Sequence, residues 1–388
     1  MDITLFPGNL SGEIAAVPSK SMAHRLLICA AFADAPTTLL CPDTGADIEA
    51  TADCLRALGA GITRTEAGYT VAPVKNLPKQ AVLPCRESGS TLRFLLPIAG
   101  ALGVDALFQM EGRLPDRPVS PLWEELERMG CSLSRPTADT IRCTGRLQPG
   151  RYSIDGSISS QFVSGLLFAQ ALMAGESSLT ITGPLESRPY VEMTKQALAI
   201  FDAPRFRSPG TLCVEGDWSS AAFWLASNAL GSDLTVTNLN PGSLQGDKAA
   251  AVLIPALREH RAISAADIPD LIPALSIVAA CGRGAVFTDI RRLRLKESDR
   301  VAAIVSMITA LGGRAEAAEN TLTVHGTGLT GGTVDPRNDH RIAMAAAIAS
   351  TACAAPVTIL NAECVSKSYP QFWADFARLG GKYELNLR

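Results

Sequence analysis

The sequence predicts an α/β protein of two domains, assembled from repeated α+β units. Its length of 388 residues exceeds the size at which a single hydrophobic core usually keeps growing. Hydrophobic residues make up 47% of the chain and aromatic residues only 5%, a composition typical of tightly packed helices lying on sheets. One local pattern also recurs at least six times: an apolar strand, a short turn rich in Ser, Gly or Asp, and a helix. These observations disfavour both a disordered chain and a helix bundle.

Each copy of the pattern supplies an N-cap residue and then apolar residues at helical spacing, such as Leu26, Leu27 and Ala30. Alternating residues predict strands between the helices, at "DTIRCTG", "GRYSIDG" and "NTLTVHG". The longest apolar run, 342–360, is broken by Pro356, so it predicts a buried helix followed by a strand and no membrane span. The six copies begin "PSKSMAHR", "ESGSTLRF", "DGSISSQF", "EGDWSSAAF", "LKESDRVA" and "RNDHRIAM".

Charge and cysteine usage narrow the class of protein. Lys and Arg number 35 and Asp and Glu 38, giving a formal net charge of −3, so we expect no basic face for nucleic acid. The ten cysteines show no CxxC or CxxH spacing, so we expect reduced core residues of a cytoplasmic protein and no metal site. The start "MDITLFPGNLSGEI" lacks a basic region followed by an apolar one, so we expect no signal or transit peptide.

Several of the predicted helices carry cations in their first turn. A helix start exposes free N–H groups and the positive end of the helix dipole, so a cation there is unfavourable unless an anion compensates it. Ordinary capping explains any one of these turns by itself. Their recurrence predicts anion binding. The cations at these starts are Lys20, Arg25, Arg93, Lys296, Arg300, His340 and Arg341.

Nine motifs, taken in order, resemble the enolpyruvyl transferase superfamily, and in particular its 5-enolpyruvylshikimate-3-phosphate synthase family. They read "PSKSMAHR", "SGSTLRF", "RLPDRPVSPL", "DGSISSQF", "SRPYVEMT", "IPD", "LRLKESDR", "NDHRIAMA" and "KSYPQFW", and they span nearly the entire chain. The resemblance implies a two-domain inside-out α/β barrel, with three βαβαββ units around a pseudo-threefold axis in each domain. It places one domain at 1–18 plus 216–388 and the other at 19–215, with one repeat truncated near 258–268.

The resemblance also implies a reaction. The enolpyruvyl group of phosphoenolpyruvate moves to the 5-hydroxyl of shikimate 3-phosphate and phosphate is released, by addition and elimination through a tetrahedral intermediate. This step belongs to the shikimate pathway of aromatic amino-acid biosynthesis. Both substrates carry a phosphate and a carboxylate, which suits clustered cations. The resemblance implies no cofactor and no metal; we expect a monomer whose partners are these small molecules, with no nucleic acid and no membrane.

Candidate site residues follow from the matching motifs, position by position. Asp270 resembles the group that receives the hydroxyl proton, and Glu297 a partner in proton transfer at the methylene carbon. The general acid stays open among Lys20, Lys367 and His340. The shikimate 3-phosphate set is Lys20, Ser21, Arg25, Ser159, Ser160, Gln161, Ser187, Tyr190, Asp270 and Lys296. The phosphoenolpyruvate set is Lys20, Gly89, Arg117, Gln161, Arg300, Arg341 and Lys367.

Gly89 also has a physical reason to be in this set. Because glycine lacks a Cβ atom, backbone N–H groups at this position can approach a phosphate closely. We therefore expect glyphosate to inhibit the protein in competition with phosphoenolpyruvate, and a larger residue at this position to weaken that inhibition.

The stretch "RRLRLKESDR" (291–300) concentrates five cations in a slightly acidic chain. Strand alternation places Arg292, Arg294 and Lys296 on one face, after which "ESDR" begins a helix. We expect Lys296 and Arg300 to meet the substrates, and the three other arginines to face solvent or acidic neighbours. Surface ion pairs within this stretch are the alternative.

Departures from the family pattern leave rival functions open. Glu87, Ser90 and Arg292 stand where the pattern has Asn, Thr and often Asn. The sister enzyme that acts on a UDP-sugar depends on a Cys in the loop that here reads "EGRLPDRP", which has none. A catalytically inactive paralogue that binds anionic metabolites is disfavoured by Asp270 and Glu297. Nucleic-acid binding through 291–300 would require salt-sensitive affinity.

Overall fold

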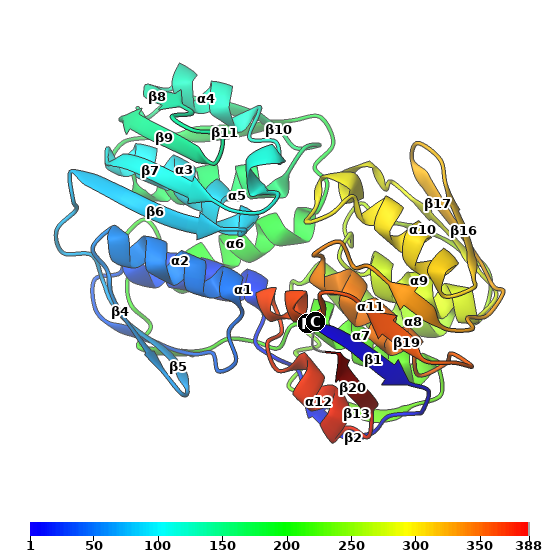
Figure 1. Ribbon diagram of the computed structural model, residues 1–388. Helices are drawn as coiled ribbons and strands as arrows, with labels where there is room; N and C mark the ends of the chain where they lie inside the picture. Colours follow the sequence, from blue (N-terminus) through cyan, green and yellow to red (C-terminus); the bar gives the residue numbers. More distant parts are fainter. Residues whose placement is uncertain (387–388) are drawn as a thin grey trace. The chain divides into compact units, whose positions relative to one another are not determined.

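The computed structural model describes residues 1–386 and shows a mixed α/β chain divided into two compact units (Figure 1). Unit 1 comprises Met1–Val17 and Glu215–Arg388, and unit 2 comprises Pro18–Val214. Each unit encloses its own hydrophobic core. The chain therefore leaves unit 1 after its first two strands and returns to it at Glu215.

Unit 2 contains six helices and ten strands in the order of the chain. The helices are α1 (Lys20–Ala31), α2 (Ala46–Ala57), α3 (Gly89–Leu102), α4 (Leu122–Arg128), α5 (Ser160–Leu172) and α6 (Arg188–Ile200). The strands are β3 (Thr37–Leu40), β4 (Gly61–Thr65), β5 (Gly68–Ala72), β6 (Gln80–Arg86), β7 (Asp105–Met110), β8 (Cys131–Ser134), β9 (Thr140–Gly145), β10 (Arg151–Asp155), β11 (Ser178–Thr182) and β12 (Thr211–Cys213).

Unit 1 repeats this composition within its described residues. Its helices are α7 (Trp218–Ala229), α8 (Ala250–Ala256), α9 (Ile272–Cys281), α10 (Arg300–Ala310), α11 (His340–Ala349) and α12 (Phe372–Arg378). Its strands are β1 (Asp2–Phe6), β2 (Ser11–Ala15), β13 (Asp233–Thr237), β14 (Arg261–Ser264), β15 (Ala285–Thr288), β16 (Arg314–Ala317), β17 (Thr321–His325), β18 (Gly332–Val334), β19 (Val357–Ile359) and β20 (Lys382–Asn386). Short 3₁₀ helices include η2 (Gly246–Ala249) and η3 (Arg291–Leu295).

Four sheets share one strand arrangement, a parallel pair extended by two antiparallel strands. In unit 2 the strand orders are β12-β3-β5-β4 and β6-β7-β9-β8, and in unit 1 they are β14-β15-β17-β16 and β18-β19-β1-β20. In the last sheet β1 pairs with both β19 and β20, so the first strand of the chain completes a sheet made from the C-terminal segment. In Figure 1 β1 and β20 lie side by side.

Each unit also contains a two-stranded sheet, which keeps the parallel pair and has no hairpin. These sheets are β10-β11 in unit 2 and β13-β2 in unit 1. After α8 ends at Ala256, β14 begins at Arg261; after α6 ends at Ile200, the next strand is β12 at Thr211. The sequence predicted one truncated repeat, near 258–268, and the structure has two short repeats.

The side chain of Asn228 covers the free edge that the missing hairpin leaves on β13. Its Nδ2 atom donates to the carbonyl oxygen of Leu234 at 2.7 Å, and its Oδ1 atom accepts from the Leu234 N–H at 2.8 Å. The neighbouring residue Asp233 bonds on the opposite side, toward β2. Asn228 therefore replaces one backbone partner of the absent strand, beside an apolar cavity of about 310 Å³ lined by α7, α8 and α9.

All six helix starts predicted from the recurring pattern are present, and each has a side-chain N-cap. They begin α1, α3, α5, α7, α10 and α11, capped by Ser19, Ser88, Ser159, Asp217, Asp299 and Asp339. The run 342–360 forms the buried end of α11 and strand β19, as predicted. Helix α9 is apolar on all sides and fully buried except at its last residue.

The predicted strand at 291–295 is wrong, because these residues form the 3₁₀ helix η3. Strand β15 ends at Thr288, and Asp289 adopts a left-handed φ of 58°, which turns the chain. A strand would place Leu293 and Leu295 on one face, yet Leu293 is 0% exposed and Leu295 is 42% exposed. The alternation of Arg and Leu at 291–295 therefore matches the period of a strand although these residues form no strand.

Three further features bear on the class of protein. No helix within residues 1–386 has both the length and the apolar character needed to cross a membrane. In the same described range no group of three or more His, Cys, Asp or Glu side chains could hold a metal ion. All ten cysteines are free, and they are buried except Cys213 and Cys281, which agrees with their prediction as core residues.

Candidate functional site

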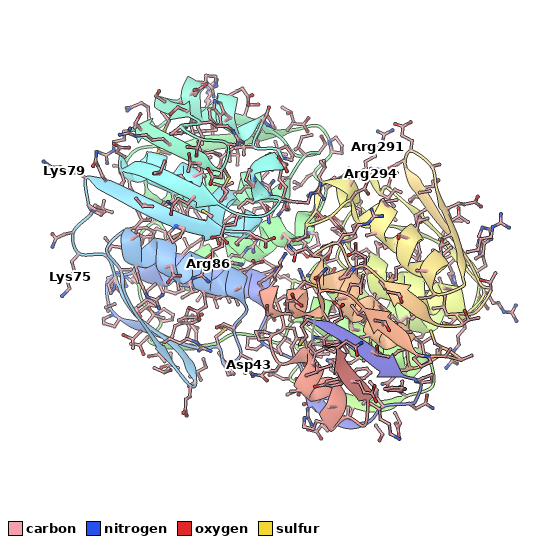
Figure 2. All side chains as sticks on the ribbon, in the orientation of Figure 1. Asp43, Lys75, Lys79, Arg86, Arg291 and Arg294 are labelled. Atoms are coloured by element: carbon pink, nitrogen blue, oxygen red, sulfur yellow. The ribbon has the colours of Figure 1, made fainter. Side chains whose placement is uncertain are left out.

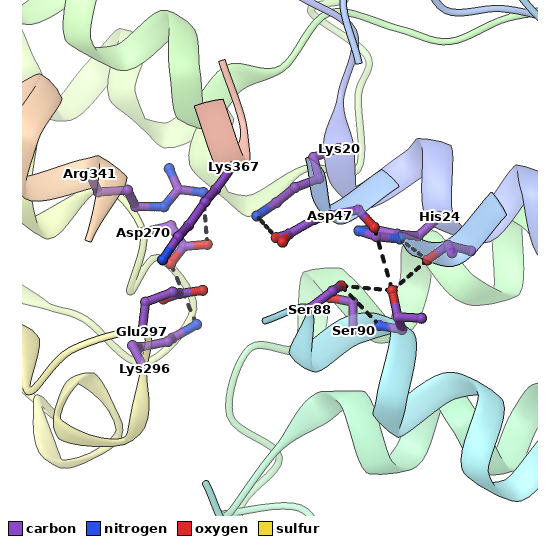
Figure 3. Close-up of polar contacts among 12 residues, drawn as sticks. Lys20, His24, Asp47, Ser88, Ser90, Asp270, Lys296, Glu297, Arg341 and Lys367 are labelled. Carbon is purple, nitrogen blue, oxygen red and sulfur yellow. Dashed lines mark hydrogen bonds and ion pairs between the residues drawn. The ribbon is translucent and has the colours of Figure 1, made fainter. Parts of the chain in front are cut away.

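The start of α1 holds Lys20 in an ion pair that the sequence did not reveal. Its Nζ atom lies 2.8 Å from Oδ2 of Asp47, in the first turn of α2 (Figure 3). The two side chains are 13% and 15% exposed, so the pair is largely shielded from solvent. Ser21 follows Lys20 and is half-buried. Asp47 therefore fixes the ammonium group in place by a charge-assisted hydrogen bond.

Two guanidinium groups converge on Gly89, the first residue of α3. A Cβ atom on Gly89 would lie 2.7 Å from Nη1 of Arg117 and 2.9 Å from Nη1 of Arg93, closer than real Cβ contacts. Arg93 also donates to Oε1 of Gln161 at 2.8 Å, and the amide of Gln161 donates to Oγ of Ser90 at 2.9 Å. This turn thus combines free helix-start N–H groups with two cations, the arrangement expected for an anion site.

A buried chain of hydroxyl groups supports the same turn. Nδ1 of His24 lies 2.7 Å from Oγ1 of Thr51, which lies 2.6 Å from Oγ1 of Thr91. Thr91 donates in turn to Oγ of Ser88, the N-cap of α3 (Figure 3). Burial, reinforced by Lys20 and Arg25, holds the pKa of His24 well below its usual value, so the imidazole is neutral. Sequence reasoning missed this chain because its members come from three helices.

Arg25 connects α1 to α6 inside unit 2. It is 2% exposed, and its three nitrogen atoms donate to Oγ1 of Thr194 at 2.9 Å and to the carbonyl oxygens of Ser21 at 2.6 Å and Tyr190 at 2.8 Å. Burial lowers the pKa of Arg25 to about 10. Arg25 therefore joins α1 to α6 through hydrogen bonds. Any anion that binds to it must contact a guanidinium group that is already hydrogen-bonded to the protein.

The remaining predicted residues of unit 2 lie at two further helix starts. Ser159 caps α5 and accepts from the N–H of Gln161 at 3.2 Å, and Ser160 is the first residue of that helix. Ser187 precedes α6 with a left-handed φ of 55°. The structure places every predicted residue of unit 2 except Arg117, Tyr190 and Arg25 at the first or second position of a helix or at its cap.

In unit 1, Asp270 lies within reach of three cations. Its Oδ1 atom is 2.7 Å from Nη1 of Arg300 and 3.4 Å from Nζ of Lys296, and its Oδ2 atom is 3.2 Å from Nη2 of Arg341. Figure 3 shows the contacts of Asp270 with Lys296 and Arg341. Burial alone would raise the pKa of Asp270, but the three cations outweigh it and hold the pKa well below the usual value. Asp270 is therefore an ionised carboxylate at any physiological pH.

Arg300 is the centre of this group of charges. Its side chain is 0% exposed, with Nε 3.0 Å from Oδ2 of Asp339 and Nη2 2.7 Å from Oε2 of Glu297, in addition to its bond with Asp270. Burial opposes the positive charge, yet the three carboxylates raise the pKa of Arg300 above its usual value. We call Asp270, Lys296, Glu297, Arg300, Asp339 and Arg341 the unit 1 cluster.

Three further predicted residues of unit 1 are Lys296, His340 and Lys367. Burial, and secondarily Arg300, lowers the pKa of Lys296 to about 8, although Asp270 opposes this shift. His340 is the first residue of α11 and is 1% exposed. Nζ of Lys367 donates to the carbonyl oxygen of Asn338 at 2.8 Å. Lys296 is therefore a group that can gain or lose a proton near neutral pH.

Arg291 and Arg294 form ion pairs with acidic residues that are not part of the unit 1 cluster. Arg291 pairs with Glu319 at 2.7 Å, and Arg294 pairs with Asp299 at 3.4 Å. Both arginines are labelled in Figure 2. Both are solvent-accessible, with 66% and 36% of their side chains exposed. The expectation that these two arginines face acidic neighbours is confirmed.

Comparison of the sequence with known families gives a match along most of the chain. A sequence model described as EPSP synthase (3-phosphoshikimate 1-carboxyvinyltransferase) matches residues 6–259 and 254–376. A 3-phosphoshikimate 1-carboxyvinyltransferase of Clostridium kluyveri is 36% identical over 417 aligned residues, covering 98% of each chain. The enzyme of the same name from Clostridium beijerinckii is 36% identical over 427, covering 99% of this chain and 98% of that one.

Two solved structures of similar proteins share the fold of this chain. An EPSP synthase from Acinetobacter baumannii superposes with a TM-score of 0.80 at 22% sequence identity and covers 100% of both chains. The enolpyruvyl transferase NikO from Streptomyces tendae superposes with a TM-score of 0.74 at 19% identity, covering 99% of this chain and 98% of its own. At these identities the similarity concerns the two-domain α/β fold.

Proposed function

Because this chain belongs to the EPSP synthase (3-phosphoshikimate 1-carboxyvinyltransferase) family, we propose that it transfers the enolpyruvyl group of phosphoenolpyruvate to the 5-hydroxyl of shikimate 3-phosphate and releases phosphate. The reaction is a step of the shikimate pathway toward aromatic amino acids. The observation that carries the proposal is the unit 1 cluster. In it both candidate proton-transfer carboxylates, Asp270 and Glu297, form ion pairs with the buried Arg300.

The substrates explain why the protein concentrates charge at helix starts. Phosphoenolpyruvate and shikimate 3-phosphate each carry a phosphate and a carboxylate, and such anions repel one another strongly at low dielectric. Cations held in place before binding lower that repulsion without reorganising during the reaction. Lys20 is held by Asp47, and Arg117 lies over Gly89, so both are positioned before an anion arrives.

We assign binding roles to the residues that match the family motifs. Shikimate 3-phosphate binds through Lys20, Ser21, Arg25, Ser159, Ser160, Gln161, Ser187, Tyr190, Asp270 and Lys296. Phosphoenolpyruvate binds through Lys20, Gly89, Arg117, Gln161, Arg300, Arg341 and Lys367. The geometry that supports this assignment is the pairing of free helix-start N–H groups with a cation in the same turn, as at Gly89.

Proton transfer falls to the ionisable groups beside these cations. Asp270 accepts the proton of the attacking hydroxyl; because its pKa is held low, it is always ionised and releases the proton readily afterwards. Glu297 acts at the methylene carbon, which gains a proton on addition and loses one on elimination. Lys20, Lys367 and His340 are the candidate acids toward the departing phosphate oxygen.

Finer features of the family belong to the same proposal. Each unit has two complete four-stranded repeats and one short repeat, which supports a pseudo-threefold arrangement of βαβαββ units and an inside-out α/β barrel. The compact units Met1–Val17 with Glu215–Arg388 and Pro18–Val214 support our proposed domains at 1–18 plus 216–388 and at 19–215, with crossings near Pro18 and Gly216. We propose a cytoplasmic monomer that needs no cofactor.

The direct test is phosphate release from phosphoenolpyruvate plus shikimate 3-phosphate. The wild-type protein should turn over, and Asp270→Asn should lose activity by about 100-fold or more while keeping its circular dichroism spectrum. Replacement of shikimate 3-phosphate by a UDP-sugar should give no phosphate. A folded wild-type protein that binds both substrates and releases no phosphate would instead identify a binding protein without catalytic function.

A further inference from the structure

A buried carboxyl group that is not among the assigned residues lies close to the unit 1 cluster. Asp247, in the 3₁₀ helix η2, is 2% exposed. Its Oδ2 atom accepts a hydrogen bond from Oγ of Ser219, in the first turn of α7. Its Oδ1 atom is buried without a hydrogen-bond partner, and no cation forms an ion pair with Asp247 among residues 1–386.

This environment favours the neutral form of the carboxyl group. An ionised carboxylate out of contact with water needs a paired cation or several hydrogen bonds, and Asp247 has one hydrogen bond. Burial and the nearby charge of Asp270 raise the pKa of Asp247 to about 7, while Arg341 and the bond from Ser219 act in the opposite direction. Asp247 therefore exchanges a proton near neutral pH, where Asp270 stays ionised.

The charged groups that face Asp247 are few. The helix η2 packs against α7 and α8. Helix α7 contributes Asp217, which also disfavours ionisation, and α8 carries no titratable side chain. Beyond these, the groups that interact with Asp247 are Asp270, before α9, and Arg341, in the first turn of α11. Arg341 is thus the cation that an ionised Asp247 would attract.

We propose that Asp247 is a positioning residue whose protonation controls anion binding by Arg341. With Asp247 neutral, one buried negative charge fewer acts on Arg341, so the guanidinium group attracts the substrate more strongly. When Asp247 releases its proton to solvent, a second buried negative charge competes with the substrate for Arg341. Anion binding is therefore linked to uptake of a proton by the ionised form of Asp247. The proposal rests on the proposed function, in which Arg341 binds phosphoenolpyruvate.

The test compares the dissociation constant of phosphoenolpyruvate at pH 6 and pH 8.5 for the wild type and Asp247→Asn, measured by isothermal titration calorimetry. Asparagine has nearly the same shape and is neutral at both values. At pH 6 the two proteins should bind within about twofold of one another. At pH 8.5 the wild type should bind about tenfold more weakly than the variant, the effect of one buried charge at short range. Ionisation of phosphoenolpyruvate itself affects both proteins equally and cancels in the ratio.

Two further measurements keep the proposal testable if Asp247→Asn does not fold. Ser219→Ala removes the bond that favours the ionised form, so the midpoint of the pH dependence should move upward. Infrared difference spectra of the wild type should show a protonated carboxyl band at pH 6 that fades by pH 8.5. Equal pH dependence in the wild type and Asp247→Asn, an unmoved midpoint in Ser219→Ala, or the absence of that band would overturn the proposal.

The infrared arm requires no catalysis and no substrate. A wild-type protein that fails to release phosphate yet shows the titrating carboxyl band would refute the proposed function alone. A protein that turns over normally, with affinity ratios that do not change between the two pH values, would refute the role of Asp247 alone.

Discussion

Removal of the Arg300 side chain should destabilise unit 1 strongly, because this fully buried arginine forms ion pairs with three carboxylates. In Arg300→Met the charges of Asp270, Asp339 and Glu297 lose the partner that lies 2.7 to 3.0 Å from each. Breaking a buried ion pair by removing one partner costs about 3–5 kcal/mol, since an unpaired charge is left out of contact with water. Asp339 is 0% exposed and should account for most of this loss.

The measurement is urea denaturation followed by tryptophan fluorescence. Three of the four tryptophans, Trp218, Trp224 and Trp373, lie in unit 1, so the signal reports mainly on the unit that carries the change. The free energy of unfolding should fall by about 3–5 kcal/mol in Arg300→Met. Adding Asp339→Asn to that variant should restore part of the loss, because it removes a buried charge that no longer has its partner.

Arg294→Met is the matched control for Arg300→Met. Arg294 is also an arginine paired with an aspartate, at 3.4 Å, but both side chains are more than a third exposed. Such pairs contribute about 0–1 kcal/mol. If Arg300→Met unfolds within about 1 kcal/mol of the wild type, like this control, then the buried charges are already compensated elsewhere and the reasoning fails.

Three other predictions concern single residues. Lys296, with its pKa lowered to about 8, loses its charge as pH rises through that value. The KM for shikimate 3-phosphate should therefore rise above pH 8, by up to about tenfold per pH unit. In Lys296→Arg the same rise in KM should begin at a higher pH, because arginine keeps its charge. Gly89→Ala should raise the inhibition constant of glyphosate by about tenfold or more, because the new Cβ displaces Nη1 of Arg117 from 2.7 Å; equal inhibition of both proteins would contradict this steric reason. Asn228→Ala should cost about 1–3 kcal/mol and speed hydrogen exchange at the Leu234 amide; unchanged exchange would show that the β13 edge is protected by other means.

Helix starts could be predicted well because their signals are local. A Ser or Asp cap and the apolar residues after it lie within one or two turns, and all six starts found in this way have a side-chain cap. Helix α9 lacks that signal because it begins with Ile272 and Pro273. Its functional neighbour Asp270 was identified only through the order of motifs, since an isolated Pro-Asp pair predicts a turn.

The carboxylates that hold the cations could not be predicted from spacing. Asp47 lies 27 residues from Lys20, and Asp339 lies 39 residues from Arg300. No periodicity joins such pairs, because the contact depends on how separate helices pack. Aspartate also caps three helices of unit 1, so the sequence gives no sign that Asp339 has a second role besides capping α11. Asp247 was missed for the same reason, since its partner Ser219 lies 28 residues away.

These distant carboxylates explain how unit 1 can concentrate cations before a substrate is present. Three cations around one point would repel each other, and here Asp270 lies within 3.4 Å of all three. Arg300 is fully paired and buried, so it resists displacement, whereas Arg341 is opposed by Asp270 at the longer distance of 3.2 Å. An entering anion should therefore engage Arg341 and Lys296 first, while Arg300 holds the carboxylates in place. The order follows from burial: Arg300, whose side chain is 0% exposed and pairs with three carboxylates, is already fixed by the fold when it meets the substrate, whereas the side chain of Lys296 is 19% exposed and can meet an anion earlier.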